Sequence, residues 1–216
     1  MTQWHPSSDQ LIEFASGSIS SALSIAVATH LHYCKACQTE VRLAETAASA
    51  LFEQQAAKSP VSFDFDALMN KLDNDEIVQE TKPDVIAEPK RFPAVVEKLI
   101  NGDVDALNWS SPMKNLHTTR LMKDENNMIV GLHHMNAGGR VPQHTHRGNE
   151  ISVVIEGGFS DELGTYAAGD FVHLNGKHNH SPLAHADGDC WLLTIVEAPV
   201  KLTGPFGWII NPFLKA

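Results

Sequence analysis

The chain has 216 residues, of which 43% are hydrophobic, and a formal net charge of -10. This length allows one large domain or two small ones, and the hydrophobic fraction is sufficient for buried cores. The negative charge argues against direct binding to nucleic acid, because phosphates would be repelled. No apolar run is long enough to cross a bilayer and no signal segment opens the chain, so we expect a cytoplasmic protein without a membrane partner.

The first part of the chain is predicted to be helical. Apolar residues recur at helical spacing in the segments 8–17, 20–34, 36–57 and 65–72. Gly17 can end the first of these helices. The polar stretch that follows contains three prolines, a composition typical of a linker. We therefore predict a helical domain over residues 1–80 and a linker over residues 81–92.

Residues 93–216 have a different pattern of residue types. Short runs rich in β-branched residues alternate with Gly, Asn and Asp turns, and these runs lie at 128–135, 150–157, 170–174 and 190–196. Several short strands separated by turn signals indicate an all-β sandwich or barrel. The predicted order is a helical domain, a linker and a β-barrel.

The stretch "ATHLHYCKAC" carries the first candidate site. His30 and Cys34 share a helix face at i and i+4, Cys37 follows one turn later, and His5 is available upstream. Structural Zn²⁺ takes four such ligands, so we predict a zinc site made of these four residues. The alternatives are a redox pair, for which the expected βαβ setting is absent, or simply two buried cysteines. His32 lies on another helix face and is predicted to be at the surface.

The second candidate site lies in "GGRVPQHTHRGNEISVVIEG". This stretch matches the first cupin motif, G-x5-H-x-H-x3-E-x6-G, through Gly138, His144, His146, Glu150 and Gly157. Alternate residues of a strand point to one face, so the two imidazoles and the carboxylate are expected to converge inside the barrel.

A second cupin motif begins at Gly169, and its histidine falls on His180, although its other positions do not match. Register favours His180 over His178. With His144, His146 and Glu150 it would bind Zn²⁺, Fe, Mn or Ni, since the donor types do not choose among them. The alternative is a metal-free pocket. The fold class is thus predicted as α + β with two domains, a small N-terminal helical zinc-binding bundle and a C-terminal cupin-type antiparallel β-barrel.

The H-x-x-x-C-x-x-C pattern with an upstream histidine, followed by a cupin-like half, resembles the ChrR family of zinc-binding anti-sigma factors. The resemblance implies a regulator that binds an extracytoplasmic-function sigma factor in a 1:1 complex and inhibits it. It also implies that the cupin domain senses an oxidant such as singlet oxygen or an organic peroxide. By the same resemblance, the zinc ligands would be His5, His30, Cys34 and Cys37.

Two other functions stay open at this stage. The barrel could be a metalloenzyme, for example dioxygenase-like, with a helical attachment, or a passive ligand binder. We expect no enzyme and assign no catalytic residue, because four protein ligands leave the helical zinc no open position. The acidic helical domain, with 11 acidic and 4 basic residues through Glu80, would favour encounter with a basic partner.

The apolar residues expected to recognise the sigma factor, unless they form the core of the helical domain, are Leu51, Phe52, Phe65 and Leu68. Cys190 is either a buried strand residue or part of the sensor.

Overall fold

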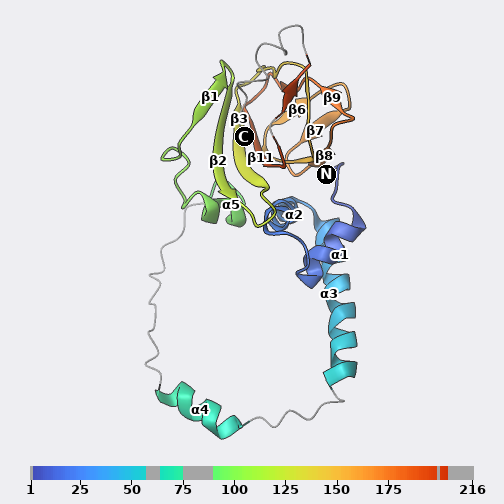
Figure 1. Ribbon diagram of the computed structural model, residues 1–216, viewed down its shortest axis with the longest axis vertical. Helices are drawn as coiled ribbons and strands as arrows, with labels where there is room; N and C mark the ends of the chain where they lie inside the picture. The colour runs from blue at the N-terminus through green and yellow to red at the C-terminus, as the bar shows by residue number, and fades with distance from the viewer. Residues whose placement is uncertain (1, 57–63, 75–89, 199, 204–216) are drawn as a thin grey trace.

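The computed structural model of the chain describes residues 2–56, 64–74, 90–198 and 200–203 (Figure 1). Its helices are α1 (Ser8–Ser16), α2 (Ser21–Tyr33), α3 (Lys35–Ala56), α4 (Phe65–Asn74) and α5 (Ala94–Leu99). The four predicted helices are confirmed, and α5 is an element that the sequence analysis did not foresee. Of the predicted linker, 81–92, all but 90–92 lies outside the described residues.

Local sequence explains how α1 begins and ends and where α2 gives way to α3. Ser7 and Gln10 form a reciprocal capping box at the start of α1, and Gly17 ends that helix in the left-handed conformation at φ 71°. Cys34 has an extended backbone, with φ −104° and ψ 102°, and so separates α2 from α3. This break places Cys34 at a corner of the chain, with Cys37 in the first turn of the next helix.

Among the described residues, twelve strands form the second half of the molecule. They are β1 (Ser110–Met113), β2 (Leu116–Lys123), β3 (Ile129–Met135), β4 (His144–Thr145), β5 (Glu150–Glu156), β6 (Gly158–Ser160), β7 (Thr165–Ala167), β8 (Phe171–Leu174), β9 (Asn179–His180), β10 (Leu183–Ala184), β11 (Cys190–Val196) and β12 (Lys201–Leu202). The four predicted strand runs correspond to β3, β5, β8 and β11. All the pairings are antiparallel, in a six-stranded sheet of order β1-β2-β3-β11-β5-β8 and two three-stranded sheets, β10-β6-β7 and β12-β4-β9. This is the predicted cupin-like antiparallel arrangement.

The six-stranded sheet is apolar on both faces. Along β5, Ile151 and Val153 belong to a core shared with the helices, whereas Val154 belongs to the core inside the barrel. Helix α2 packs against β5 and β11 with Ala26 and Val27 fully buried (Figure 1). The helices and the barrel therefore share a hydrophobic core.

The segment before α1 extends the contact between helices and barrel. The backbone N–H groups of Gln3 and Trp4 both donate to Asp170 Oδ1, at 2.6 and 3.1 Å, and Phe171 N–H donates to the Trp4 carbonyl at 3.0 Å. The chain entering α1 is thus held against the start of β8.

Gly169, in the turn before β8, is the point of closest approach. Its φ is +95°, and a Cβ placed there would lie 2.5 Å from Thr2 Cγ2 and 2.6 Å from Tyr33 Cβ. Only glycine meets both constraints without strain. The first residue of the second cupin motif is therefore also where the helical half docks.

Within the described ranges, no single helix is both long and apolar enough to span a membrane. Helices α1 and α2 reach that length and hydropathy only when they are taken together, and they are bent by 109° with respect to each other.

We predict that Gly169→Ala lowers the free energy of unfolding by about 2 kcal/mol or more, because it adds backbone strain and crowds Tyr33. Urea denaturation of the full chain measures this. Gly188→Ala is the matched control, since a Cβ at Gly188 meets nothing within 4 Å. Equal losses in the two variants would contradict the role of Gly169 in docking.

Candidate metal centres

The first cluster joins the segment before α1, the end of α2 and the start of α3. His5 Nδ1 lies 3.4 Å from His30 Nε2 and 3.4 Å from the sulfur of each cysteine, Cys34 and Cys37. His30 Nε2 lies 3.3 Å from Cys37 Sγ. The structure thus brings together the four residues that the sequence nominated, and their donor atoms all lie within 4.8 Å of one another.

These distances are those of a tetrahedron around an ion. With nitrogens at about 2.0 Å and sulfurs at about 2.3 Å from Zn²⁺, neighbouring donors are about 3.3–3.8 Å apart. His30 Nδ1 donates to the carbonyl oxygen of Gly169 at 2.6 Å, and burial lowers the pKa of His30, so the ring is neutral and its Nε2 lone pair faces the cluster. Three of the four side chains are buried, and only His5 is exposed.

The two thiols differ in their protonation. Burial works against a Cys34 thiolate, but hydrogen bonds from Thr2 and from the Cys37 backbone outweigh burial and lower the pKa of Cys34. Burial and the neighbouring Cys34 raise the pKa of Cys37 to about 12. A divalent ion bound by both sulfurs would displace the proton of Cys37.

The second cluster lies inside the barrel, where β4 pairs with β9. His144 and His180 are register partners across these strands. His180 Nε2 lies 3.1 Å from His144 Nε2 and 3.0 Å from His146 Nε2, and all three rings are buried. The structure places His180 with these two histidines, whereas His178 is only half-buried and its Nδ1 accepts the Asn175 N–H.

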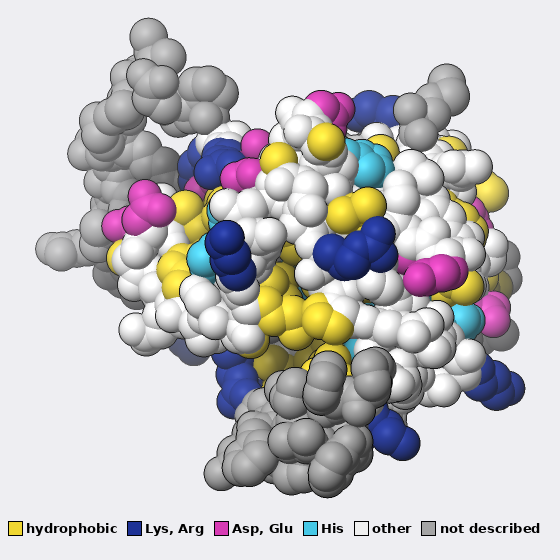
Figure 2. Space-filling view, turned by 90° about the horizontal axis from the view of Figure 1, so that it is seen from above, with side chains coloured by type: hydrophobic (Ala, Val, Ile, Leu, Met, Phe, Trp, Pro, Cys, Tyr) yellow, Lys and Arg dark blue, Asp and Glu magenta, His cyan; other side chains and the backbone are white. Residues whose placement is uncertain are grey.

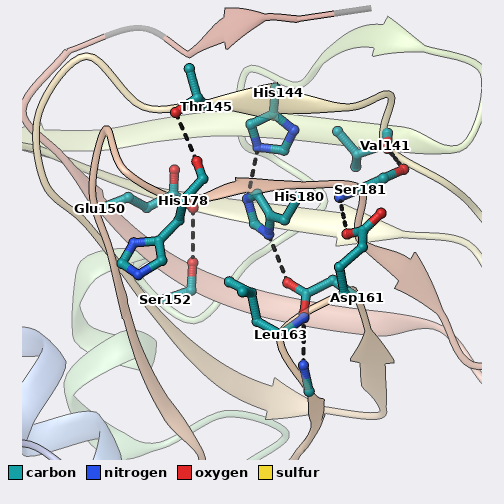
Figure 3. Close-up of polar contacts among 12 residues, drawn as sticks. Val141, His144, Thr145, Glu150, Ser152, Asp161, Leu163, His178, His180 and Ser181 are labelled. Carbon is teal, nitrogen blue, oxygen red and sulfur yellow. Dashed lines mark hydrogen bonds and ion pairs between the residues drawn. The ribbon is translucent and has the colours of Figure 1, made fainter.

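Each ring of the second cluster uses its other nitrogen as a donor. His144 Nδ1 donates to the Pro142 carbonyl at 2.9 Å, and His146 Nδ1 donates to Glu150 Oε2 at 2.9 Å. His180 Nδ1 donates to Asp161 Oδ2 at 2.7 Å (Figure 3). A neutral imidazole has one N–H, so three Nε2 lone pairs point at one another. A cation between these nitrogens, or a proton shared by two of them, relieves the repulsion, and the donor set fits a metal ion.

Glu150 lies beside this convergence point without belonging to the histidine group. Its carboxylate accepts hydrogen bonds from His146 and from Ser152 Oγ. Burial alone would raise the pKa of Glu150, but the hydrogen bond from His146 and the nearby imidazoles lower it to about 2. Its negative charge therefore favours a cation at the cluster, and its direct ligation remains a prediction.

A cavity of about 510 Å³ opens beside the second cluster. Its walls are mainly aliphatic, and the ionisable groups on them are Arg120, His133, His144, Glu150 and His180. Seen from the end of the barrel away from the helices, hydrophobic side chains gather near the centre of the face (Figure 2). The volume is that of a site for a small organic molecule, next to the histidines.

Sequence reasoning missed Asp161 and Asp170, both with buried side chains. Asp161 holds His180, and Asp170 holds the segment that carries His5. Asp161 lies three residues before Gly164 and Asp170 directly follows Gly169, and aspartate is common near such turns, so neither stood out. His133, left unassigned by the sequence, reaches the cavity wall, and burial lowers its pKa.

We predict that Cys34→Ser removes one equivalent of bound metal and lowers the free energy of unfolding. The loss would be about 4 kcal/mol at a free metal concentration of 1,000 times Kd. Elemental analysis and denaturation of the full chain measure both effects. Cys190→Ala is the control, because Cys190 belongs to neither cluster. An unchanged metal content in Cys34→Ser would argue against the first centre.

We also predict a pH effect in the metal-free protein, because burial lowers the pKa of His144 to about 4 from its ordinary 6.5. Unfolded His144 takes up a proton below pH 6.5, whereas folded His144 resists until about pH 4. Stability is therefore lost as the pH falls through this window, by about 2–3 kcal/mol between pH 7 and pH 4.5. Urea denaturation of chelator-treated protein tests this, and His144→Gln should show a smaller fall. An equal fall in that variant would contradict the assignment.

Comparisons with known proteins agree with this architecture. Residues 97–199 match a family model described as the ChrR cupin-like domain. The chain is 28% identical over 216 residues, covering both proteins completely, to the anti-sigma-E factor ChrR of Cereibacter sphaeroides.

A chain in the crystal structure of Rhodobacter sphaeroides SigE in complex with the anti-sigma ChrR superposes with a TM-score of 0.73. The match has 24% identity and covers 91% of this chain and 99% of that chain. It shows that the helical half and the barrel occur together in one fold. The resemblance drawn from the sequence is confirmed: residues 97–199 match the ChrR cupin-like domain, and the whole chain is similar to the anti-sigma-E factor ChrR.

Proposed function

We propose that this protein is an anti-sigma factor that binds an extracytoplasmic-function sigma factor in a 1:1 complex and inhibits it. Residues 1–80 would be the binding domain and residues 93–216 the sensory domain. The names of the two ChrR proteins support this proposal. A sigma factor works with RNA polymerase, so the proposed compartment is the cytoplasm, and we propose no enzymatic activity.

The observation that carries the proposal is a set of large apolar side chains in solvent on α3 and α4. Their exposed fractions are 64% for Leu51, 73% for Phe52, 61% for Phe65 and 40% for Leu68. These residues do not form a core in the described structure, which was the alternative left open by the sequence. Large apolar side chains exposed along a helix are typical of a segment that binds another protein.

The first metal centre supports this surface from one end. Its ligands come from three separate pieces of chain, and one of them, Cys37, lies in the first turn of α3. An ion there, which we propose to be Zn²⁺, would fix the direction in which α3 leaves the barrel. Since Zn²⁺ with four protein ligands has no open position, its role would be structural.

The barrel would supply the release signal. We propose that an oxidant or small ligand acts at the second cluster, in the cavity beside it, and that singlet oxygen or an organic peroxide is the stress. Cys190 is a poor first target, because its side chain is fully buried and burial raises its pKa to about 12. The interpretation of Cys190 as a buried strand residue is therefore favoured over a sensing role.

A cupin metalloenzyme, such as a dioxygenase, is the second candidate function. The cavity of about 510 Å³ next to three convergent imidazoles favours it. Oxygen uptake by protein loaded with Fe or Mn, in the presence of small phenols or diketones, distinguishes the two candidates. Turnover would support the enzyme, and its absence together with sigma binding would support the regulator.

We predict that Phe52→Asp or Phe65→Asp weakens binding of the cognate sigma factor at least about 10-fold, because each places a charge in the proposed interface. Calorimetric titration with the full chain measures this. Leu163→Asp is the matched control, since Leu163 is an exposed leucine of the barrel, 42% accessible, away from both helices. Wild-type affinity in both phenylalanine variants would rule out this surface as the interface.

A further inference from the structure

Two buried carboxylates stand at opposite ends of the short strand β7. Asp161, before the strand, accepts the Nδ1–H of His180 at 2.7 Å and the backbone N–H groups of Leu163 and Gly164 at 2.8 and 3.0 Å (Figure 3). Asp170, after the strand, accepts the backbone N–H groups of the segment that carries His5. This part of the chain therefore contacts a residue of the barrel cluster at one end and the segment that leads to His5 at the other.

Tyr166, in the middle of β7, joins these ends through its side chain. Its hydroxyl is close enough to the Asp161 carboxylate to interact with it, and the residue is 1% exposed. Its ring packs on Trp4 with centroids 5.4 Å apart and planes inclined by 49°. Gly164 completes the contact, because a Cβ there would lie only 3.2 Å from Trp4 Cζ2. Packed groups thus run without interruption from the barrel histidine to the residue before His5.

The far end of this path is the least secured ligand of the first cluster. His5 is exposed, and the helices that follow do not include it. Trp4 is held by its packing on Tyr166 and by backbone hydrogen bonds to Asp170 and Phe171. A shift of Tyr166 would be passed directly to the segment that sets the position of His5.

We propose that Asp161, Tyr166 and Trp4 are positioning residues that couple the two clusters, so that losing the metal of the barrel cluster weakens metal binding by the first. Removing an ion from between His144, His146 and His180 would free His180 to move with Asp161. Tyr166 and Trp4 would follow and loosen His5. The inference rests on the proposed function and deepens it, because it names how the state of the barrel reaches the sigma-binding helices.

Cobalt provides a readout specific to the first cluster. Co²⁺ bound by thiolates has sulfur charge-transfer absorption, and the barrel cluster contains no sulfur. The measurement is the rate at which a chelator removes this absorption from the full chain. It is compared between the wild type and His144→Ala, which empties the barrel cluster without touching Asp161. His146→Ala serves in its place if His144→Ala does not fold, because His146 contacts Glu150 and not Asp161.

The expected result is release about 5-fold faster in His144→Ala, within the usual range of coupling between sites. Tyr166→Phe keeps the ring and removes the hydroxyl, and in that background the effect of His144→Ala should fall by at least half. Tyr33→Phe is the matched control, because its hydroxyl ties α2 to the Ile155 carbonyl at 2.8 Å but lies off the path. In that background the effect should persist.

An acceleration below about 2-fold in His144→Ala would overturn the proposal. So would an acceleration that Tyr166→Phe reduces by less than half, or one that Tyr33→Phe reduces as much as Tyr166→Phe does. The sigma factor is absent from the assay, so coupling can fail while the proposed function stands. Failure of sigma binding would in turn leave a measured coupling intact.

Discussion

The structure depends on one constraint: in each of two clusters, the lone pairs of buried nitrogen or sulfur atoms point toward a common position. In the barrel, His180 Nε2 lies 3.0 and 3.1 Å from the Nε2 atoms of His146 and His144, while each Nδ1 contacts a carbonyl or carboxylate oxygen. In the helical half, the nitrogens and sulfurs are separated by 3.3–3.4 Å. Polar atoms buried in this way require a cation or protons to compensate them, and the donor set of each cluster fits a metal ion.

This constraint acts on a molecule whose two halves share their packing. The six-stranded sheet buries one face against α2 and the other inside the barrel, so β5 and β11 contribute to both cores. Hydrogen bonds also orient the helices relative to the barrel, above all the 2.6 Å bond from His30 to the Gly169 carbonyl. A ligand of the helical centre is thus oriented by the backbone of the barrel, which makes the two centres parts of one structure.

The sequence predicted those helices, strands and ligand sets that a pattern within one short segment identifies. Strands β3, β5, β8 and β11 appear as nearly continuous apolar runs because both faces of the sheet are covered. The three-residue strands β6 and β7 are too short to show a period, and α5 has only six residues. His180 was preferred to His178 from register alone, and the structure places it with His144 and His146.

What the sequence did not contain was the environment of these groups. An apolar face on α2 does not say that a sheet covers it, so the shared core was not foreseen. Asp161 and Asp170 look like ordinary turn residues until the hairpin brings one to a histidine and the other to the N-terminal segment. Their roles depend on contacts between residues far apart in the chain, which local patterns do not encode.

The turn at Gly169 bears on how such proteins could be recombined. In a barrel without the helices, the glycine would be needed only for its positive φ, and the residues around it could vary. Here the same turn receives Tyr33, Thr2 and His30 from the other half. A chimaera that joined the helices of one relative to the barrel of another would therefore have to inherit this turn together with its helical counterpart, since the junction in space is far from the junction in sequence.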